Sequence, residues 1–341
     1  MKDAWFLHRV ALASLGDALR YTSISARSVF QTLRHRQRFS IRPFLGLVWR
    51  FPSRWLRIYR VRTVSKLCIR RHDNGFFANV LAVLDVVANA RADCAIFVDW
   101  TLDGTERQFR YGEPGLNVWD EIFEPLSPLD KLDSFPGPAY RISQRLSPLL
   151  VSRGRNMLAD SRSYFAERSR YHQVYRATFR IRNKYVEHEL EEYRAMMKGK
   201  ICLGVHKRVG YRHFASHQRS FQLPDNKMVI ECIERTIRGW KPDERLIYLA
   251  TDDLDCAELF SRHFGNRLIC RSNVQRVRSS DDIEVHKLDW GKVGVKDACD
   301  VLIDGLLLAE CKAVLHQSSN VSTAVSFINP TVEMIHFDDV S

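Results

Sequence analysis

Apolar runs that end abruptly in polar residues recur along the second half of the chain. The clearest is Ile201-Cys-Leu-Gly-Val-His206, which leads directly into Lys207, Arg208 and Gly210. Further runs of this kind cover 246–251, 267–271, 313–316 and 332–336. The segments between them predict helices that follow Asp225, end near His263, cover about 298–309 and begin near Ser318. Regular alternation of buried strands and helices predicts a doubly wound α/β domain with a parallel sheet over 199–341.

A second α/β unit is predicted earlier in the chain. Residues 65–70 and 94–100 are typical of buried strands, and the apolar segment 76–92 between them is typical of a helix. This order implies parallel strands. In the turn before the helix, Gly75 with Asn74 is expected to supply a positive φ and free backbone amides.

The region between these two units is less regular. Residues 101–160 are rich in loop formers, with one short helix expected at 117–125. Residues 163–198 predict a polar helix able to bridge two domains. We therefore expect an N-terminal extension (1–65), a first Rossmann-like domain (66–198) and a second one (199–341).

The excess of positive charge lies at the N-terminus of the chain. Residues 1–66 carry 14 Lys and Arg against two acids, so the formal net charge of +12 belongs to this arm and the rest is balanced. Aromatic residues such as Trp49, Trp55 and Tyr59 lie among the arginines. Two interpretations of the arm are equally favoured: a segment that binds an anionic membrane surface, and a helical extension whose arginines are solvated. A segment that binds nucleic acid is less favoured than either.

Cysteine and hydropathy restrict the class of protein. The eight cysteines lie far apart without a C-x-x-C motif, which favours reduced core thiols in a reducing compartment. No stretch is apolar enough for a transmembrane helix, and His8, Arg9 and Asp17 interrupt any signal-peptide core. We expect a cytoplasmic protein, with the arm able to hold it at the inner face of the membrane.

Three predicted strand ends carry the candidate chemistry. They are His206-Lys207-Arg208-Val-Gly210, Thr251-Asp252-Asp253 and His316-Gln-Ser318-Ser319-Asn320. Parallel strands place such ends at one edge of a sheet. Arg208 could bind a phosphate at this edge, and the helix N-terminus after Ser318 and Ser319 is a second candidate phosphate-binding site, which we call the phosphate seat. A carboxylate such as Asp304 could accept hydrogen bonds from the Watson–Crick edge of guanine.

These motifs resemble those of the GDP-fucose-dependent fucosyltransferases, most closely the rhizobial nodulation fucosyltransferases and the core α-1,6-fucosyltransferases. The matching residues are the H-x-R motif His206-Lys207-Arg208, the Ala250-Thr251-Asp252-Asp253 strand end and the segment from Asp304 to Ser319. Gly75-Phe-Phe-Ala-Asn79 is similar to the Gly-rich first loop of the family. The resemblance covers roughly 66–341.

The resemblance implies a GT-B fold, with two Rossmann-like domains facing a cleft. It implies inverting transfer of fucose from GDP-fucose to a hydroxyl of a glycan or lipid-linked saccharide, without a metal or other cofactor. Arg208 would bind the diphosphate, Asp304 would read guanine and Ser319 would touch phosphate. The remaining expected site residues are His206, Lys207, Gly210, Thr251, Asp252, Asp253, Ser318 and Asn320 for the donor, and Asn74, Gly75, Phe76 and Asn79 in the first loop.

Several alternatives stay open at this point. Arg208 is also expected to take part in catalysis. The catalytic base could be His213, His217 or Asp73, which all fall in predicted cleft loops. Asp253-Leu-Asp255 has the D-x-D form of a manganese site, although we prefer helix capping for it. Family members often carry a second Arg or an Asp where this chain has Val209 and Tyr211, so a GT-B protein that binds nucleotide or glycan without turnover is an alternative. A further alternative is a scaffold protein that acts through the basic arm.

Overall fold

The strands form two parallel sheets. The computed structural model describes residues 56–107, 109–127, 138–143, 145–146, 157–160, 162–208, 224–278, 285, 288 and 292–340. The first sheet has the order β2-β1-β3 and the second has the order β6-β5-β4-β7-β8. The strands are β1 (Lys66–Arg70), β2 (Ala95–Asp99), β3 (Tyr140–Ile142), β4 (Ile201–Lys207), β5 (Arg245–Thr251), β6 (Leu268–Ile269), β7 (Ala313–His316) and β8 (Glu333–His336). Every strand pair is parallel, which confirms the predicted α/β class.

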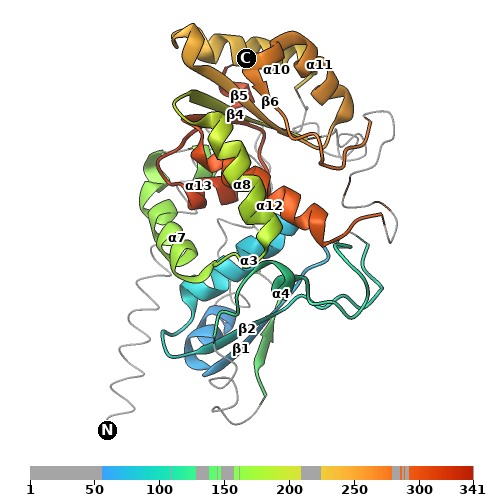
Figure 1. Ribbon diagram of the computed structural model, residues 1–341. Helices are drawn as coiled ribbons and strands as arrows, with labels where there is room; N and C mark the ends of the chain where they lie inside the picture. Colours follow the sequence, from blue (N-terminus) through green and yellow to red (C-terminus); the bar gives the residue numbers. More distant parts are fainter. Residues whose placement is uncertain are drawn as a thin grey trace, which may run out of the picture.

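Helices separate the two sheets and cover the outer face of the second. The α-helices are α3 (Phe76–Asn89), α4 (Val118–Ile122), α6 (Met157–Asp160), α7 (Phe165–Thr178), α8 (Lys184–Met197), α10 (Asn226–Ile237), α11 (Leu254–Phe264), α12 (Val295–Glu310) and α13 (Asn320–Ile328). Short 3-10 helices cover Arg162–Tyr164, Pro242–Glu244, Gly265–Arg267 and Phe337–Asp339. In Figure 1, α10 and α11 lie above the second sheet, while α3, α8, α12 and α13 lie between it and the sheet that contains β1 and β2.

One apolar core runs across this middle layer. It joins Leu67 of β1 and Phe77 of α3 to Leu307 of α12 and Tyr248 of β5. A smaller core lies on the opposite face of the second sheet, under α10 and α11. The boundary that we predicted near residue 199 falls between α8 and β4. Its role as a domain boundary stays a prediction.

Local sequence signals explain where several helices begin. The Asp225 carboxylate accepts a hydrogen bond from the Met228 amide at 2.7 Å, which confirms Asp225 as the N-cap of α10. Asp253 and Ser319 cap α11 and α13 in the same way. A side-chain oxygen at each of these positions satisfies an amide that has no partner in the first turn of a helix.

Two local predictions were wrong. The polar segment 163–198 is not one helix, because 180–182 hydrogen-bonds with 122–124 through Glu124 N to Arg180 O and Arg182 N to Ile122 O. Asn183 then caps a new helix, α8. Gly75 has a φ of −60° and an extended backbone, not the expected positive φ, because it is the N-cap of α3. The structure also adds β3, which was not predicted, and shortens the strand expected at 267–271 to Leu268–Ile269.

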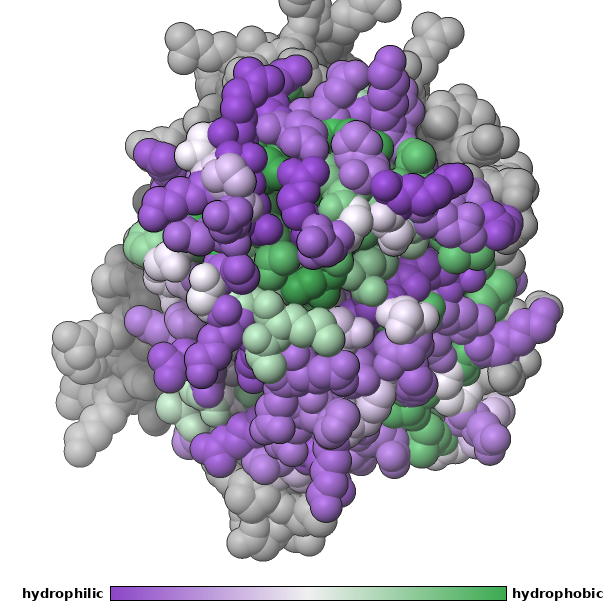
Figure 2. Space-filling model, turned by 45° about the horizontal axis from the view of Figure 1, so that its top comes forward, coloured by the Kyte–Doolittle hydropathy of each residue, from purple (hydrophilic) through white to green (hydrophobic). Residues whose placement is uncertain are grey.

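Polar side chains dominate the face of the molecule drawn in Figure 2, where apolar residues form small separate patches. Large exposed apolar side chains in the described part of the chain are Leu56, Tyr59, Phe165 and Met196. None of the described helices has the length and apolar character needed to cross a membrane. All eight cysteines are in the described residues and are reduced, and all but Cys270 are buried, as predicted. Nearly all of the basic arm, 1–55, lies outside the described residues.

Replacing Gly305 with alanine should destabilise the contact between the two halves of the chain. A Cβ atom at Gly305 of α12 would collide with the Phe77 ring of α3. Alanine gains about 1 kcal/mol of helix propensity over glycine, whereas overpacking a core costs about 1–3 kcal/mol. Because Phe77 is buried and the displaced group is a ring, we expect the free energy of unfolding in urea to fall by about 1 kcal/mol or more. Gly239→Ala is the control, since a Cβ there meets nothing within 4 Å. Equal stability of both variants would contradict the prediction.

Candidate functional site

The carboxyl ends of β4, β5 and β7 meet at one edge of the second sheet. The strand order runs outward in both directions from the neighbours β4 and β7, so the topological switch point lies between them. His206 is in register with His316 of β7, and Lys207 is in register with Thr251 of β5. The predicted convergence of three polar strand ends is therefore confirmed. Ligands of open α/β sheets bind at such a switch point.

The two cations that follow β4 have different environments. Lys207 is buried, and its Nζ lies 3.1 Å from Asp253 Oδ2. Arg208 Nε lies 3.5 Å from Asp252 Oδ2, and its side chain keeps 22% of its exposure against 7% for Lys207. A buried ion pair is costly to break. Arg208 is therefore the better placed of the two to reach an anionic ligand, with Asp252 holding it near the edge.

The contacts of Asp253 give it a structural role as the N-cap of α11. Its Oδ1 accepts a hydrogen bond from the Cys256 amide at 3.1 Å, and its own amide donates to Thr251 Oγ1. Asp255, the second carboxylate of the D-x-D segment, pairs with Arg278 at 2.6 Å on the surface of α11. The capping interpretation of this segment is confirmed.

The α13 N-terminus closes the edge beside His206. The Ser322 amide donates to Ser319 Oγ at 3.0 Å, and the Ser319 amide donates to Ser322 Oγ at the same distance. Ser319 Oγ also lies 3.5 Å from His206 Nδ1. Burial, reinforced by the Arg208 and His316 charges, lowers the pKa of His206 to about 3. His206 is therefore neutral and orients its neighbours without adding charge for a phosphate. Ser318 Oγ lies 3.4 Å from His336 Nε2.

The first loop of the N-terminal half is built around Asn79 and Asp73. Asn79 is buried and bonds the backbone of His72, Asn74 and Gly75, so its role is to shape the loop. The Asp73 carboxylate accepts hydrogen bonds at 3.1 Å from the amides of Arg107 and Phe109. The Phe76 ring is buried in the aromatic core, not in the loop.

Arg145 joins this loop to the α13 N-terminus. Its Nη2 donates to Ala78 O at 3.3 Å and to Asn320 Oδ1 at 2.7 Å. The predicted N-terminal loop and the predicted phosphate seat are thus brought together by a residue that the sequence did not single out. Gly210, His213 and His217 lie outside the described residues.

Asp304 belongs to a second group of charged side chains that we call the Arg271 cluster, in which only Lys296 is exposed: Arg271, Glu189, Lys296, Asp300 and Asp304. Arg271 is 1% exposed, and its Nη2 lies 2.9 Å from Glu189 Oε2 and 2.6 Å from Asp300 Oδ1. Its Nη1 lies 3.4 Å from Asp304 Oδ1, which also accepts from Tyr248 OH at 2.7 Å. Arg276 connects the cluster to the sheet edge by donating to Arg271 O and Thr251 O.

Comparison with known proteins identifies the fold. No family model and no curated protein matches the chain. The crystal structure of fucosyltransferase NodZ from Bradyrhizobium aligns with 81% of this chain and 97% of its own, at 17% identity and a TM-score of 0.50. The chain has the fold of this fucosyltransferase. NodZ α-1,6-fucosyltransferase co-crystallised with GDP aligns with 79% of this chain and 94% of its own (15% identity, TM-score 0.48). Apo POFUT1 aligns with 81% and 99% (10% identity, TM-score 0.41).

The fucosyltransferase fold confirms the resemblance that the motifs indicated and the GT-B architecture that it implied. Within this fold, sequence reasoning missed Tyr248, Arg271 and Arg145. Tyr248 lies within β5, and Arg271 lies two residues after the end of β6 at Ile269. No local sequence signal at either position shows that the side chain has a buried charged partner. Arg271 and Arg276 also line a cavity of about 520 Å³ beside α11.

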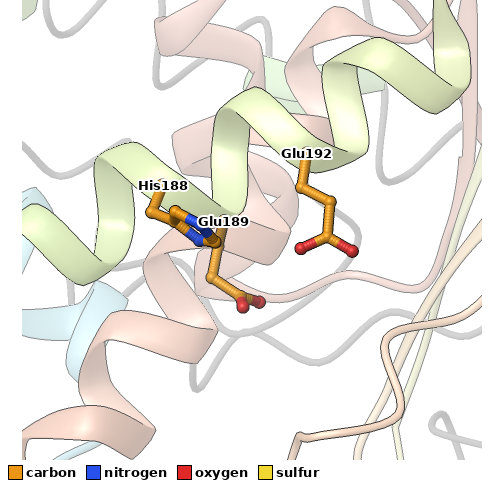
Figure 3. A group of neighbouring side chains, drawn as sticks. All are labelled: His188, Glu189 and Glu192. Carbon is orange, nitrogen blue, oxygen red and sulfur yellow. The ribbon is translucent and has the colours of Figure 1, made fainter.

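One further cluster in the described residues has the composition of a metal site. Figure 3 shows His188, Glu189 and Glu192 projecting from α8, and their ligand atoms lie within 4.8 Å of one another. The Glu189 carboxylate, however, already accepts from Arg271 and from Asn273 Nδ2. His188 and Glu192 are exposed. The contacts of Glu189 favour a structural role for it in the Arg271 cluster.

Proposed function

We propose that this chain is an inverting glycosyltransferase that moves fucose from GDP-fucose to a hydroxyl of a glycan or lipid-linked saccharide. The observation that carries the proposal is the meeting of Arg208, Asp252 and Ser319 at the switch point of a fucosyltransferase fold. An anionic nucleotide is the ligand class that this edge suits. NodZ, whose fold the chain shares, is a fucosyltransferase.

The proposed roles follow from the surroundings of each residue. Arg208 binds the diphosphate through charge-assisted hydrogen bonds. Ser319 and the first amides of α13 receive a phosphate, as helix N-termini do. Asp304 accepts hydrogen bonds from guanine. His206 positions Ser319, while Thr251 and Asp253 fix the backbone that carries Asp252.

Inversion requires a base that removes the proton of the acceptor hydroxyl while the anomeric carbon is attacked and GDP leaves. Asp73, His213 and His217 remain the proposed candidates for it. The two amide hydrogen bonds to Asp73 hold its carboxylate in place. We propose that the reaction needs no metal, because Asp253 caps a helix and pairs with Lys207.

A donor screen tests this function. The full chain is incubated with GDP-fucose, GDP-mannose and UDP-sugars in the presence of an oligosaccharide panel, and released GDP or UDP is measured. We expect GDP release from GDP-fucose, unchanged by EDTA. UDP release, or loss of activity in EDTA, would contradict the proposal. Tight GDP binding with no turnover across the panel would instead favour a binding protein of the same fold.

We also propose that the basic arm binds an anionic membrane surface, because the excess positive charge of the chain lies there with aromatic residues between the arginines. Flotation with liposomes that contain anionic lipid should carry the full chain upward and leave behind a shortened chain that begins at Val64. Liposomes of neutral lipid are the control. Equal flotation of the two chains would overturn this proposal.

A further inference from the structure

The two carboxylate oxygens of Asp304 have different surroundings. Oδ1 accepts from Tyr248 OH at 2.7 Å and lies 3.4 Å from Arg271 Nη1. Among the described residues, no hydrogen bond or ion pair reaches Oδ2. The Asp304 side chain is 17% exposed, against 1% for Arg271 and 2% for Asp300. Oδ2 is therefore the oxygen that a ligand can use.

Asp304 shares its ion-pair partner Arg271 with Glu189 and Asp300. Lys296 adds a second cation on Asp300, and the charge of Arg276 acts on Asp304 without an ion pair between the two among the described residues. Lys296 pairs with Asp300 at 2.7 Å, and Arg271 lies closer to Glu189 and Asp300 than to Asp304. A largely buried carboxylate needs donors for both oxygens. A ligand that presents N–H groups would supply the donors that Oδ2 lacks.

The contacts on Oδ1 also keep Asp304 able to accept such bonds. Burial raises the pKa of Asp304, while the Arg271 charge and the Tyr248 hydrogen bond oppose that rise. Tyr248 is fully buried in β5, so its hydroxyl is held in a fixed place beside Asp304. These two neighbours fix both the orientation and the charge of the carboxylate.

We propose that Tyr248 and Arg271 are positioning residues for donor recognition, which hold Asp304 by Oδ1 so that Oδ2 faces the N–H edge of a guanine base. The inference rests on the proposed function, since it assigns to Asp304 the reading of GDP. It adds that base selectivity depends on a hydroxyl in the middle of β5 and on an arginine after β6, neither of which touches the nucleotide.

Tyr248→Phe tests the proposal by removing one hydroxyl and leaving the ring in place. Binding of GDP and ADP to the full chain is measured by calorimetry for the parent, Tyr248→Phe and Asp304→Asn. Tyr171→Phe is the matched control, because Tyr171 OH also donates to a buried carboxylate, Asp85 Oδ1, at 2.9 Å in the N-terminal half. Thermal unfolding of every variant checks that it is folded.

We expect Tyr248→Phe to weaken GDP binding about tenfold, which is the effect of losing roughly one charge-assisted hydrogen bond. ADP binding should change little, so the preference for GDP over ADP falls. Tyr171→Phe should keep the parent preference. Asp304→Asn should lose the preference almost completely, because its amide meets the guanine donors with donors of its own.

The pH profile of GDP binding separates positioning from a general structural role. The charged and titratable groups that act on Asp304 or respond to it are Tyr193, Tyr248, Cys270, Arg271, Arg276 and Asp300. Ionised Asp304 binds the base, so affinity is lost as pH falls through its pKa. Because Tyr248→Phe removes a bond that favours the ionised form, this loss should move to higher pH in the variant and stay in place in Tyr171→Phe.

Three results would overturn the proposal, and each has a different consequence for the proposed function. If Asp304→Asn loses the preference for GDP and Tyr248→Phe keeps it together with the parent pH profile, Tyr248 does not position Asp304. If neither variant changes GDP binding while Arg208→Ala abolishes it, the assignment of guanine to Asp304 fails and the phosphate site stands. Absence of GDP binding by the parent would remove the proposed function itself.

Discussion

Arg208→Ala should weaken GDP binding by roughly 100- to 10,000-fold, because each charge-assisted hydrogen bond to a phosphate contributes about 1.5–3 kcal/mol and the guanidinium can form two. Lys207 cannot take over, since its ammonium is buried against Asp253. His206 cannot either, because burial keeps it neutral. Calorimetry with GDP gives the affinity, and release of GDP from GDP-fucose gives the rate.

Arg208→Lys and Arg91→Ala complete the experiment. Lysine keeps the charge without the planar fork, so its affinity should fall between those of the parent and Arg208→Ala. Arg91 pairs with the exposed Asp93, and its removal should leave GDP binding unchanged. If Arg208→Ala binds GDP as the parent does, the sheet edge at β4 is not the diphosphate site.

Arg271→Met should lower the free energy of unfolding by about 3–5 kcal/mol, the usual cost of removing one partner from a buried ion pair. Glu189 and Asp300 would lose their closest cation inside the protein, and Asp304 would lose its nearest one. Methionine fills much of the same volume, so the loss would come from charge more than from packing. Urea unfolding of the full chain measures it.

The control is another arginine that pairs with two carboxylates but is exposed. Arg278 contacts Asp255 and Glu258 on the surface of α11. Arg278→Met should leave the urea midpoint almost unchanged, because exposed ion pairs contribute little. Equal losses in the two variants would mean that the buried position of Arg271 is not what makes it stabilising.

The predictable part of this molecule is the part that local pattern determines. Apolar runs such as Ile201–His206 have the length and composition of buried strands, and their alternation with helices leaves a parallel sheet as the natural arrangement. Parallel strands bring their carboxyl ends to one edge, so the order of the strand ends along the chain is enough to place Arg208, Asp252 and Ser319 together. The N-cap roles of Asp225 and Asp253 follow from the same local chemistry.

The Arg271 cluster could not be predicted, because its members come from three separate segments of the chain: α8, the residues after β6, and α12. Glu189 comes from a helix that the polar pattern described only as a bridge, and Asp300 lies 29 positions beyond Arg271. The sequence around a charged residue does not show whether its side chain will be solvated or will pair with another charge inside the protein. The extended Gly75 escaped prediction for a related reason, since a glycine permits a positive φ without requiring one.

The apolar core that joins β1, α3, α12 and β5 has a consequence for how the chain loses its structure. Contacts that pass through one continuous core make its parts unfold together. The close approach of Gly305 to Phe77 lies in the middle of that core. Heat should therefore produce one calorimetric transition for the two halves. A fragment that begins at residue 199 would expose the surface of α12 that normally covers α3, and we expect it to aggregate.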